Sequence, residues 1–224
     1  MLGKLFFVLN LIRGIPAWLA LCLSGKKDLV EREAVRYRWF LEEDRDVSFF
    51  RAYNLLLWKY PAYRNQVIYR CAEGSRLCSY VIRMLYPPKK DLEVGGDIGE
   101  GLVVYHGHGT VIAAHSIGKN FQIYQGATVG KNTKPDQPWY NPTIGDDVTV
   151  YTNAVVAGNI TIGDNVEIGA GAVVTGKMDA PDGSMILGSP AKVVKEVSDA
   201  QKQSNLHSAE HYLELAAAQL QKQL

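Results

Sequence analysis

An aliphatic residue at every sixth position is the feature of this sequence that most restricts its fold. The period of six fits neither a helix, with about 3.6 residues per turn, nor an alternating strand. It predicts a chain that coils as a triangular prism and turns one aliphatic side chain inward on each flat face, as in a parallel β-helix. The positions are Val111, Ile117, Ile123 and Val129 upstream, then Ile144, Val150, Val156, Ile162, Ile168 and Val174, with Ala180 and Ile186 on the same count.

Glycine and other small residues recur in register with this period. Glycine often follows the inward aliphatic residue, and we expect it at the prism corners, where left-handed backbone angles are cheap for Gly and tolerable for Asn and Asp. Ala or Val stands two positions before the next aliphatic residue, where a modest side chain fits the narrow interior. The glycines follow Ile98, Ile117, Val129, Ile144, Ile162 and Ile168, and the small residues are Ala127, Val148, Ala154, Val166 and Ala172.

The pattern divides the chain into three zones. Residues 1–88 are predicted to be helical, residues 89–194 to form the coil, and residues 195–224 to form a polar tail with a short helix that Ser208 could cap. The boundary falls at Pro87-Pro88, because a helix cannot continue through a double proline.

In the helical zone we predict a helix from about Asp28 and a second one that begins after Asp46 or Ser48 and stops at Pro61. A third helix is expected over 64–85, although Gly74 stands in its middle.

The apolar segment 2–23 has three possible interpretations. Arg13 lies near its centre, and Gly14 and Pro16 interrupt it. It could form a pair of helices that are buried or face another subunit, an interfacial membrane anchor, or a cleaved signal peptide, although the small residues of a cleavage site are missing.

Composition excludes several classes of protein. The formal net charge is +1 and no strong basic field is present, which argues against nucleic-acid binding. The three cysteines, Cys22, Cys71 and Cys78, form neither a disulfide framework nor a CxxC motif, so we expect them to serve packing.

The period slips first between Val104 and Val111, which are seven residues apart. Three of the five histidines lie between positions 106 and 115, and glycines flank the first two. The cluster could be a metal site with His115 as third ligand, a structural pair, or a catalytic base, since imidazole accepts a proton near neutral pH. Among these histidines we favour His106 as the base.

The second slip separates Val129 from Ile144 by fifteen residues. The segment 131–143 carries three prolines and no repeat, so we predict a loop thrown off the coil. It is either a tolerated insertion or a binding element, and Trp139 and Tyr140 within it favour binding.

Together these features resemble the left-handed β-helix acyltransferases, and in particular their serine acetyltransferase branch. Gly188-Ser189-Pro190-Ala191-Lys192 matches the family's closing Gly-x-Pro-Ala-Arg/Lys, and 101–109 resembles the branch's Gly-(aliphatic)-x-Asp-His-(Ala/Gly)-x-Gly. Residues 60–65 resemble a helical segment of serine-acetyltransferase-like proteins from polysaccharide biosynthesis loci. The predicted fold class is therefore mainly β, a left-handed parallel β-helix with an N-terminal α-helical region and a short C-terminal helix.

The resemblance implies transfer of an acetyl group from acetyl-CoA to a hydroxyl, without an acyl-enzyme and without a metal. It implies that His106 removes the hydroxyl proton and that Asp91, fifteen residues earlier as in the branch, orients the imidazole, with Glu93 as the alternative. The residues implied for acetyl-CoA are Gly130 and Lys131 near the thioester, Thr152 and Ala170 along the pantetheine and adenine path, and Lys192, which could meet a phosphate.

Two departures from the branch concern the acceptor. Tyr105 replaces an Asp, and Tyr140-Asn141 replaces Arg-His, so charges suited to a zwitterionic amino acid are missing. A saccharide hydroxyl becomes an alternative to serine. The residues implied for acceptor binding are Tyr105, His108, Gln125, Trp139, Tyr140 and Asn141.

The family's active site lies between subunits, so a homotrimer is expected, with the helical zone as a further dimerisation surface. We expect a cytoplasmic protein that could touch the inner face of the membrane through residues 1–24. A non-catalytic β-helix scaffold and a metal-dependent, carbonic-anhydrase-like enzyme stay open as alternatives.

Overall fold

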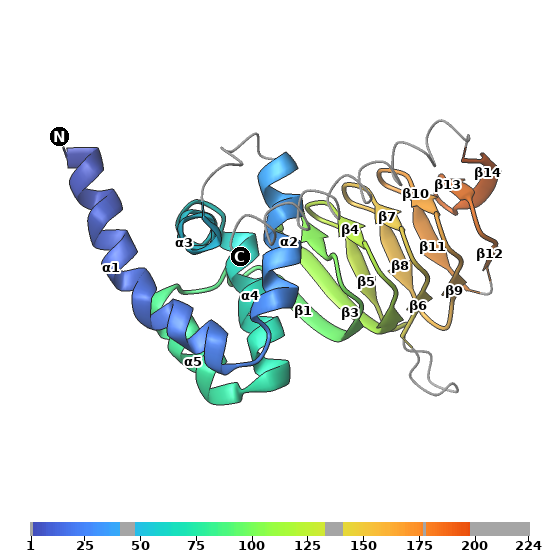
Figure 1. Ribbon diagram of the computed structural model, residues 1–224. Helices are drawn as coiled ribbons and strands as arrows, with labels where there is room; N and C mark the ends of the chain where they lie inside the picture. Colours follow the sequence, from blue (N-terminus) through green and yellow to red (C-terminus); the bar gives the residue numbers. More distant parts are fainter. Residues whose placement is uncertain (1, 41–47, 133–140, 177, 198–224) are drawn as a thin grey trace. The chain divides into compact units, whose positions relative to one another are not determined.

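The computed structural model describes residues 2–40, 48–132, 141–176 and 178–197 (Figure 1). The chain divides into two compact units, residues 1–90 and residues 91–224. Ser208 and most of the predicted C-terminal tail lie outside the described residues, as do Asp46, Trp139 and Tyr140.

The second unit is a parallel β-helix, as the period of six predicts. Its first sheet follows the order β11-β8-β5-β3-β6-β9-β12, with β1 paired to β3, and its second follows β14-β13-β10-β7-β4-β2. All pairings are parallel except β13 with β14. The strands are β1 (Leu92–Ile98), β2 (Val103–Val104), β3 (Thr110–Ile117), β4 (Gln122–Ile123), β5 (Thr128–Gly130), β6 (Thr143–Ile144), β7 (Thr149–Val150), β8 (Val155–Ala157), β9 (Thr161–Ile162), β10 (Glu167–Ile168), β11 (Val173–Thr175), β12 (Asp179–Ala180), β13 (Ser184–Leu187) and β14 (Lys192–Glu196).

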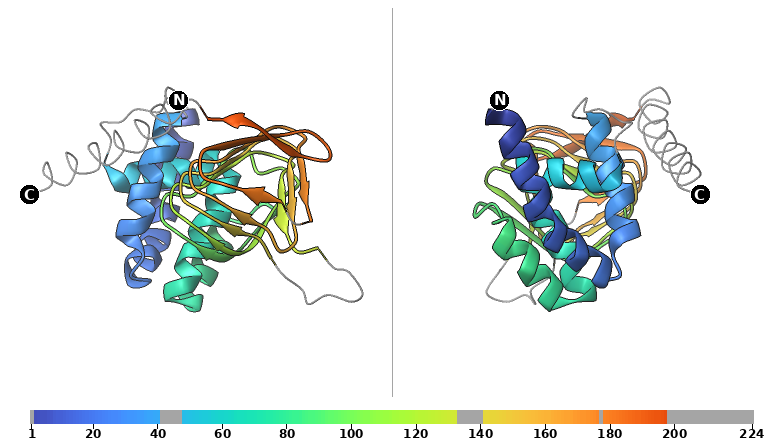
Figure 2. Two further views of the ribbon diagram at one scale, coloured as in Figure 1. Left: turned by 90° about the vertical axis from the view of Figure 1, so that its right-hand side faces the viewer. Right: turned by 60° about the vertical axis from the view of Figure 1, so that its left-hand side comes forward.

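Three columns of stacked aliphatic side chains fill the coil, one for each face. Paired strands hold the members of a column in register, and every member is at most 4% exposed. Figure 2, left, looks along the stack of coils. Column one is Val104, Ile123, Val150, Ile168 and Ile186; column two is Ile112, Val129, Val156 and Val174; column three is Ile98, Ile117, Ile144, Ile162 and Ala180.

The first slip is larger than the sequence suggested, because Val111 is not a core residue. Ile112 is 1% exposed and pairs with Val129, whereas Val111 is only partly buried and pairs with Thr128. The long strand β3 spans two faces of the prism, so Ile112 and Ile117 turn inward only five residues apart. The count of six therefore fails on this strand.

Gly118, Gly145 and Gly163, which follow inward residues, serve close packing between coils, which corrects the backbone reason expected for them. Gly118, Gly145 and Gly163 are not among the residues with positive φ. A Cβ on Gly145 or Gly163 would collide with the carboxylate of the Asp on the next coil. These carboxylates form a ladder: Asp146 accepts from the Lys119 amide (2.6 Å), Asp164 from the Asp146 amide (2.7 Å) and Asp182 from the Asp164 amide (2.8 Å).

Five helices are described in the first unit: α1 (Leu2–Leu23), α2 (Lys27–Phe40), α3 (Phe49–Lys59), α4 (Pro61–Gly74) and α5 (Arg76–Leu85). The single helix predicted over 64–85 is wrong, because the chain breaks after Gly74 and Ser75 caps α5 by accepting the Cys78 amide (3.3 Å). The predicted break inside 2–23 is also wrong, since α1 continues through Pro16. Among the described residues, no helix has both the length and the apolar content needed to cross a membrane.

A buried ion pair lies inside the helical unit. Arg70 on α4 and Glu33 on α2 are at most 1% exposed, and an Arg70 nitrogen lies 2.7 Å from Glu33 Oε1. Gln66 donates to Glu33 Oε2 (2.7 Å), and the Tyr37 hydroxyl donates to Gln66 Oε1 (2.8 Å). These bonds satisfy charges that would otherwise be expensive to bury.

Candidate active site

Six of the thirteen predicted site residues lie at one corner of the coil, between columns one and two. We call this the histidine corner: residues 105–109 on the first coil, 124–126 on the second, 151–153 on the third and 169–171 on the fourth. Backbone bonds join the coils here, from the Gly126 amide to His108 O (2.7 Å) and from the Asn153 amide to Gln125 O (3.1 Å). The corner therefore brings together Tyr105, His106, His108, Gln125, Thr152 and Ala170.

His106 occupies a tight turn that does not require an imidazole. Its φ is +57°, and the turn continues through Gly107 at +64°. Among the described residues, the other non-glycine residues with positive φ are Asn120, Asp147, Asn153 and Asn165. Asn, Asp and His enter this region more readily than other residue types. Asn would therefore adopt this backbone conformation equally well. The backbone does not explain a histidine at this exposed position, so we attribute it to the imidazole.

Asp91 lies beside His108. Asp91 Oδ2 is 3.5 Å from His108 Nδ1 and accepts the Gly109 amide at 3.3 Å. Both side chains are at least half exposed. A carboxylate at Nδ1 holds the ring in the tautomer that leaves Nε2 free to accept a proton. The contact expected between Asp91 and His106 stays a prediction, while the observed pair makes His108 a second candidate for the base.

A stack of tyrosines extends this corner along the coil. The Tyr105 and Tyr124 rings are parallel within 11° at 4.3 Å, and Tyr151 follows at 5.2 Å from Tyr124. Burial raises the pKa of Tyr124, partly offset by a hydrogen bond with Tyr105. Burial, then the charges of Glu167 and Tyr124, raise the pKa of Tyr151 to about 12.

Tyr124 and Tyr151 were missed by the sequence reasoning, although a signal was present. Each follows an inward residue of column one, as Tyr105 does.

Gln125 presents an acceptor atom with no partner. Among the described residues, its Oε1 is buried and receives no hydrogen bond. A buried amide oxygen without a donor is unfavourable, and a bound hydroxyl would relieve it.

The remaining predicted residues lie elsewhere on the coil. Gly130 and Lys131 follow column two and Asn141 precedes column three, so they flank the loop at a different corner from His106 and His108. His115 lies at that second corner, where its amide donates to Pro142 O (2.8 Å). Lys192 is exposed at the start of β14. Within the described part of the chain no group of three His, Cys, Asp or Glu side chains could hold a metal ion.

Part of the coil matches a known protein family. Residues 141–176 match the family described as bacterial transferase hexapeptide (six repeats). The coil carries the hexapeptide repeat of these transferases. The resemblance predicted from the sequence is thereby confirmed.

Serine acetyltransferases are among the proteins similar to this chain. Those of Staphylococcus aureus strain Mu50 and of Staphylococcus xylosus are each 40% identical, over 107 and 123 residues, which cover 47% and 54% of this chain and 49% and 55% of theirs. The chain thus spans about half the length of the curated relatives it matches. The crystal structure of the Neisseria gonorrhoeae serine acetyltransferase in complex with serine superposes with a TM-score of 0.57 at 26% identity, over 80% of this chain and 72% of that one. The predicted parallel β-helix with an N-terminal helical region is confirmed, and the predicted C-terminal helix lies outside the described residues.

Proposed function

We propose that this protein is an acetyl-CoA-dependent O-acetyltransferase that acts on the hydroxyl of serine or of a saccharide. The observation that carries the proposal is the histidine corner, where an imidazole–carboxylate pair and a second imidazole lie on a hexapeptide-repeat coil similar to that of serine acetyltransferases. Geometry of this kind suits general-base catalysis.

The reaction moves one proton and exchanges one bond. The imidazole takes the proton of the acceptor hydroxyl as the oxygen attacks the thioester carbonyl carbon. The C–S bond breaks, the acetyl group stays on the acceptor oxygen, and the imidazolium returns the proton to the thiolate of CoA. We assign the base to His106, with His108 as the alternative that its contact with Asp91 supports.

The described residues of the histidine corner include no Lys, Arg, Asp or Glu, and Asp91 lies beside them. Tyr105 stacks on Tyr124, and the Oε1 of Gln125 is available to a hydroxyl donor. A neutral hydroxyl compound fits these groups, whereas the α-carboxylate of serine would need a cation. Trp139 and Tyr140, outside the described residues, and Asn141 would complete this side from the loop.

Separation of the two corners favours a trimer. The residues assigned to the thioester, Gly130 and Lys131, lie at the loop corner, whereas Thr152 and Ala170 lie at the histidine corner. A site that uses both sets is complete where the histidine corner of one copy meets the loop corner of the next. The backbone amides of Gly130 and Lys131 would then stabilise the oxyanion, and Lys192 would meet a phosphate of CoA.

The experiment is an acetyl-CoA turnover assay with serine and a panel of sugars and nucleotide sugars, read as release of free thiol. We expect acceptor-dependent release, with Gln125→Ala raising the KM for the acceptor several-fold and leaving the KM for acetyl-CoA unchanged. Activity on serine alone would contradict the neutral-acceptor assignment. If no acceptor is acetylated and calorimetry shows no binding of CoA, the protein is a non-catalytic β-helix.

A further inference from the structure

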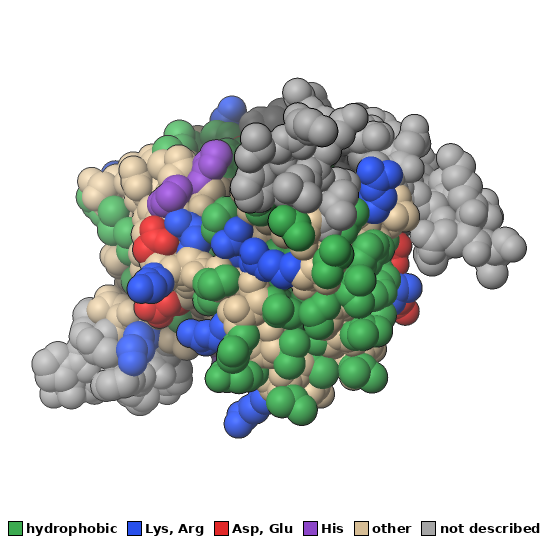
Figure 3. All heavy atoms as spheres, turned by 90° about the vertical axis from the view of Figure 1, so that its left-hand side faces the viewer, with side chains coloured by type: hydrophobic (Ala, Val, Ile, Leu, Met, Phe, Trp, Pro, Cys, Tyr) green, Lys and Arg blue, Asp and Glu red, His purple; other side chains and the backbone are tan. Residues whose placement is uncertain are grey.

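Large apolar side chains gather on the exposed face of two helices in the first unit. On α1 they recur at the spacing of one helical face, and α5 adds three more. Figure 3 shows a broad hydrophobic field on this side of the helical unit. Each of the eight side chains is at least 50% exposed: Leu9, Ile12, Ile15, Leu19 and Leu23 on α1, and Leu77, Tyr80 and Met84 on α5.

The two helices form one surface. They are packed against each other, and the Tyr86 hydroxyl, directly after α5, donates to Asn10 Oδ1 on α1 (3.1 Å). We call the eight exposed side chains the α1–α5 face. Exposed apolar surfaces of this extent mark sites that bind a partner or a membrane.

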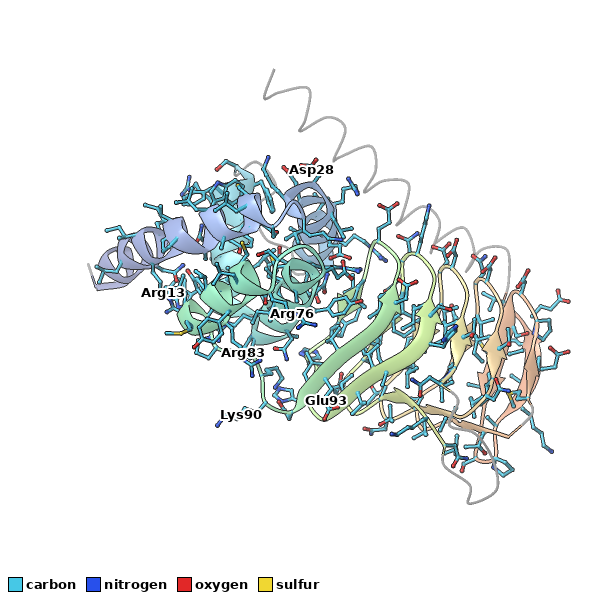
Figure 4. All side chains as sticks on the ribbon, turned by 90° about the horizontal axis from the view of Figure 1, so that it is seen from below. Arg13, Asp28, Arg76, Arg83, Lys90 and Glu93 are labelled. Carbon is cyan, nitrogen blue, oxygen red and sulfur yellow. The ribbon has the colours of Figure 1, made fainter. Side chains whose placement is uncertain are left out.

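Every charge on these two helices is positive. Neither α1 nor α5 contains Asp or Glu, while α1 carries Lys4 and Arg13 and α5 carries Arg76 and Arg83. Arg76 and Arg83 are exposed, and within the described part of the chain neither is paired with a carboxylate (Figure 4). Arg76 and Arg83 therefore lie beside the exposed apolar side chains of α5, and no described carboxylate pairs with them.

Arg64, on α4, adds a further positive charge close to Arg13. The Arg13 guanidinium lies over the Tyr86 ring at 4.0 Å. The pKa of Arg64 is lowered, first by burial and then by the positive charge of Arg13 nearby. Arg64 already donates to Trp58 O (2.8 Å) and Pro87 O (3.2 Å). An anion close to Arg13 would relieve this repulsion.

An anionic lipid surface matches both the apolar side chains and the positive charge of this face. A second copy of the chain matches only the apolar side chains. Symmetric pairing of two α1–α5 faces would bury the apolar side chains, but it would also bring like charges together with no acidic residue between them. A membrane interface accepts an apolar helix face among its acyl chains and offers phosphates to the arginines beside it.

We propose that the α1–α5 face lies on anionic lipid, with Leu77, Met84 and the exposed face of α1 among the acyl chains and Arg76 and Arg83 at the phosphates. This inference does not depend on the acetyltransferase proposal, because none of these residues belongs to the histidine corner.

The test is co-sedimentation of the full chain with phosphatidylcholine vesicles, with and without phosphatidylglycerol. Two variants change the face at exposed helical positions: Arg76→Glu/Arg83→Glu reverses the charge of α5, and Leu77→Gln/Met84→Gln removes apolar area. The matched control, Lys119→Glu/Lys195→Glu, makes the same change of net charge on exposed residues of the coil. Light scattering after gel filtration, without lipid, gives the oligomeric state of each protein.

We expect wild type and control to bind the anionic vesicles and not the neutral ones. Each cation near such a surface contributes about 1 kcal/mol, so the charge variant should lose at least about tenfold in partitioning. The apolar variant should lose a similar factor. The proposal is overturned if wild type ignores anionic vesicles, if the control loses as much as the charge variant, or if the apolar variant keeps its lipid binding and instead falls to a smaller oligomer.

Discussion

The coil and the helical unit of this protein are stabilised in different ways. Each turn of the coil is stabilised by the same features: aliphatic columns inside, hydrogen bonds along the axis and ladders of Asp side chains at exposed corners. The helical unit surrounds the buried ion pair Glu33–Arg70 with buried phenols such as Tyr53 and Tyr63, whose pKa values burial raises well above the usual range. A defect in the coil should therefore weaken neighbouring coils alone, whereas a defect at the ion pair concerns the whole unit.

The largest loss of stability is expected from Glu33→Leu. Removing one partner of a buried pair costs about 3–5 kcal/mol, because it leaves the other charge buried without compensation. Urea unfolding followed by far-ultraviolet circular dichroism measures this loss. The control is Glu73→Gln. Glu73 is partly exposed, so its contact with Arg70 (3.4 Å) should contribute less than about 1 kcal/mol. Adding Arg70→Met to Glu33→Leu should restore part of the loss; no restoration would contradict the role given to the buried charge.

A truncation in the coil should follow, through Ile168→Ala in column one. Ile168 is fully buried between Val150 and Ile186, so the cavity should cost about 2–5 kcal/mol. Val194→Ala, at a position 52% exposed, should stay within about 0.5 kcal/mol. Equal losses in the two variants would contradict the column description.

Two glycines allow the stability cost of left-handed backbone to be measured apart from the cost of a steric collision. Gly109 and Gly126 both have positive φ (58° and 73°), but only at Gly126 would a Cβ collide, with the side chain of Asn153. Both changes to Ala should cost about 1–2 kcal/mol for the left-handed conformation. Gly126→Ala should cost more, and the difference in urea midpoint measures the collision. A larger loss in Gly109→Ala would reverse this assignment.

The smallest effect is expected at alkaline pH from the tyrosine stack. The folded pKa of Tyr151, about 12, lies above the value of about 10 for an unfolded chain. The stability that neutral Tyr151 contributes is therefore complete below about pH 10 and is lost as the pH rises toward 12. Tyr151→Phe should flatten the fall of unfolding free energy across this window. Glu167→Gln should move the phenolate absorbance titration to lower pH, and an unchanged titration would contradict the contribution of Glu167.

The sequence predicted the coil well because a core position there depends only on the period. The period gave the wrong core residue where one strand spans two faces, at Val111 and Ile112. It also could not explain the glycines, because the side chains that require a glycine there lie on the next coil. The break at Gly74-Ser75 could not be predicted from helical periodicity, because it depends on Ser75 capping α5.

The candidate site was found through the slips in the period, which pointed to His106 and His108. Spacing along the chain could suggest that Asp91 meets an imidazole, but it could not say which one. Asp91 is eighteen residues from Gly109, one coil away, and the turn through His106 and Gly107 decides which ring lies beside it. How residues of the histidine corner and the loop corner combine depends on contacts that no single chain contains.

The most direct test of the central claim compares His106→Asn with His108→Asn in acetyl-CoA turnover. Asn is the residue that other corners of this coil use at positive φ, so His106→Asn removes the imidazole and keeps the turn. We expect kcat to fall by about 10²–10⁴ in His106→Asn, as for loss of a general base, with a smaller loss in His108→Asn and an unchanged unfolding midpoint in both. The reverse order would transfer the base to the Asp91–His108 pair. Full turnover in both variants would contradict imidazole catalysis at this corner.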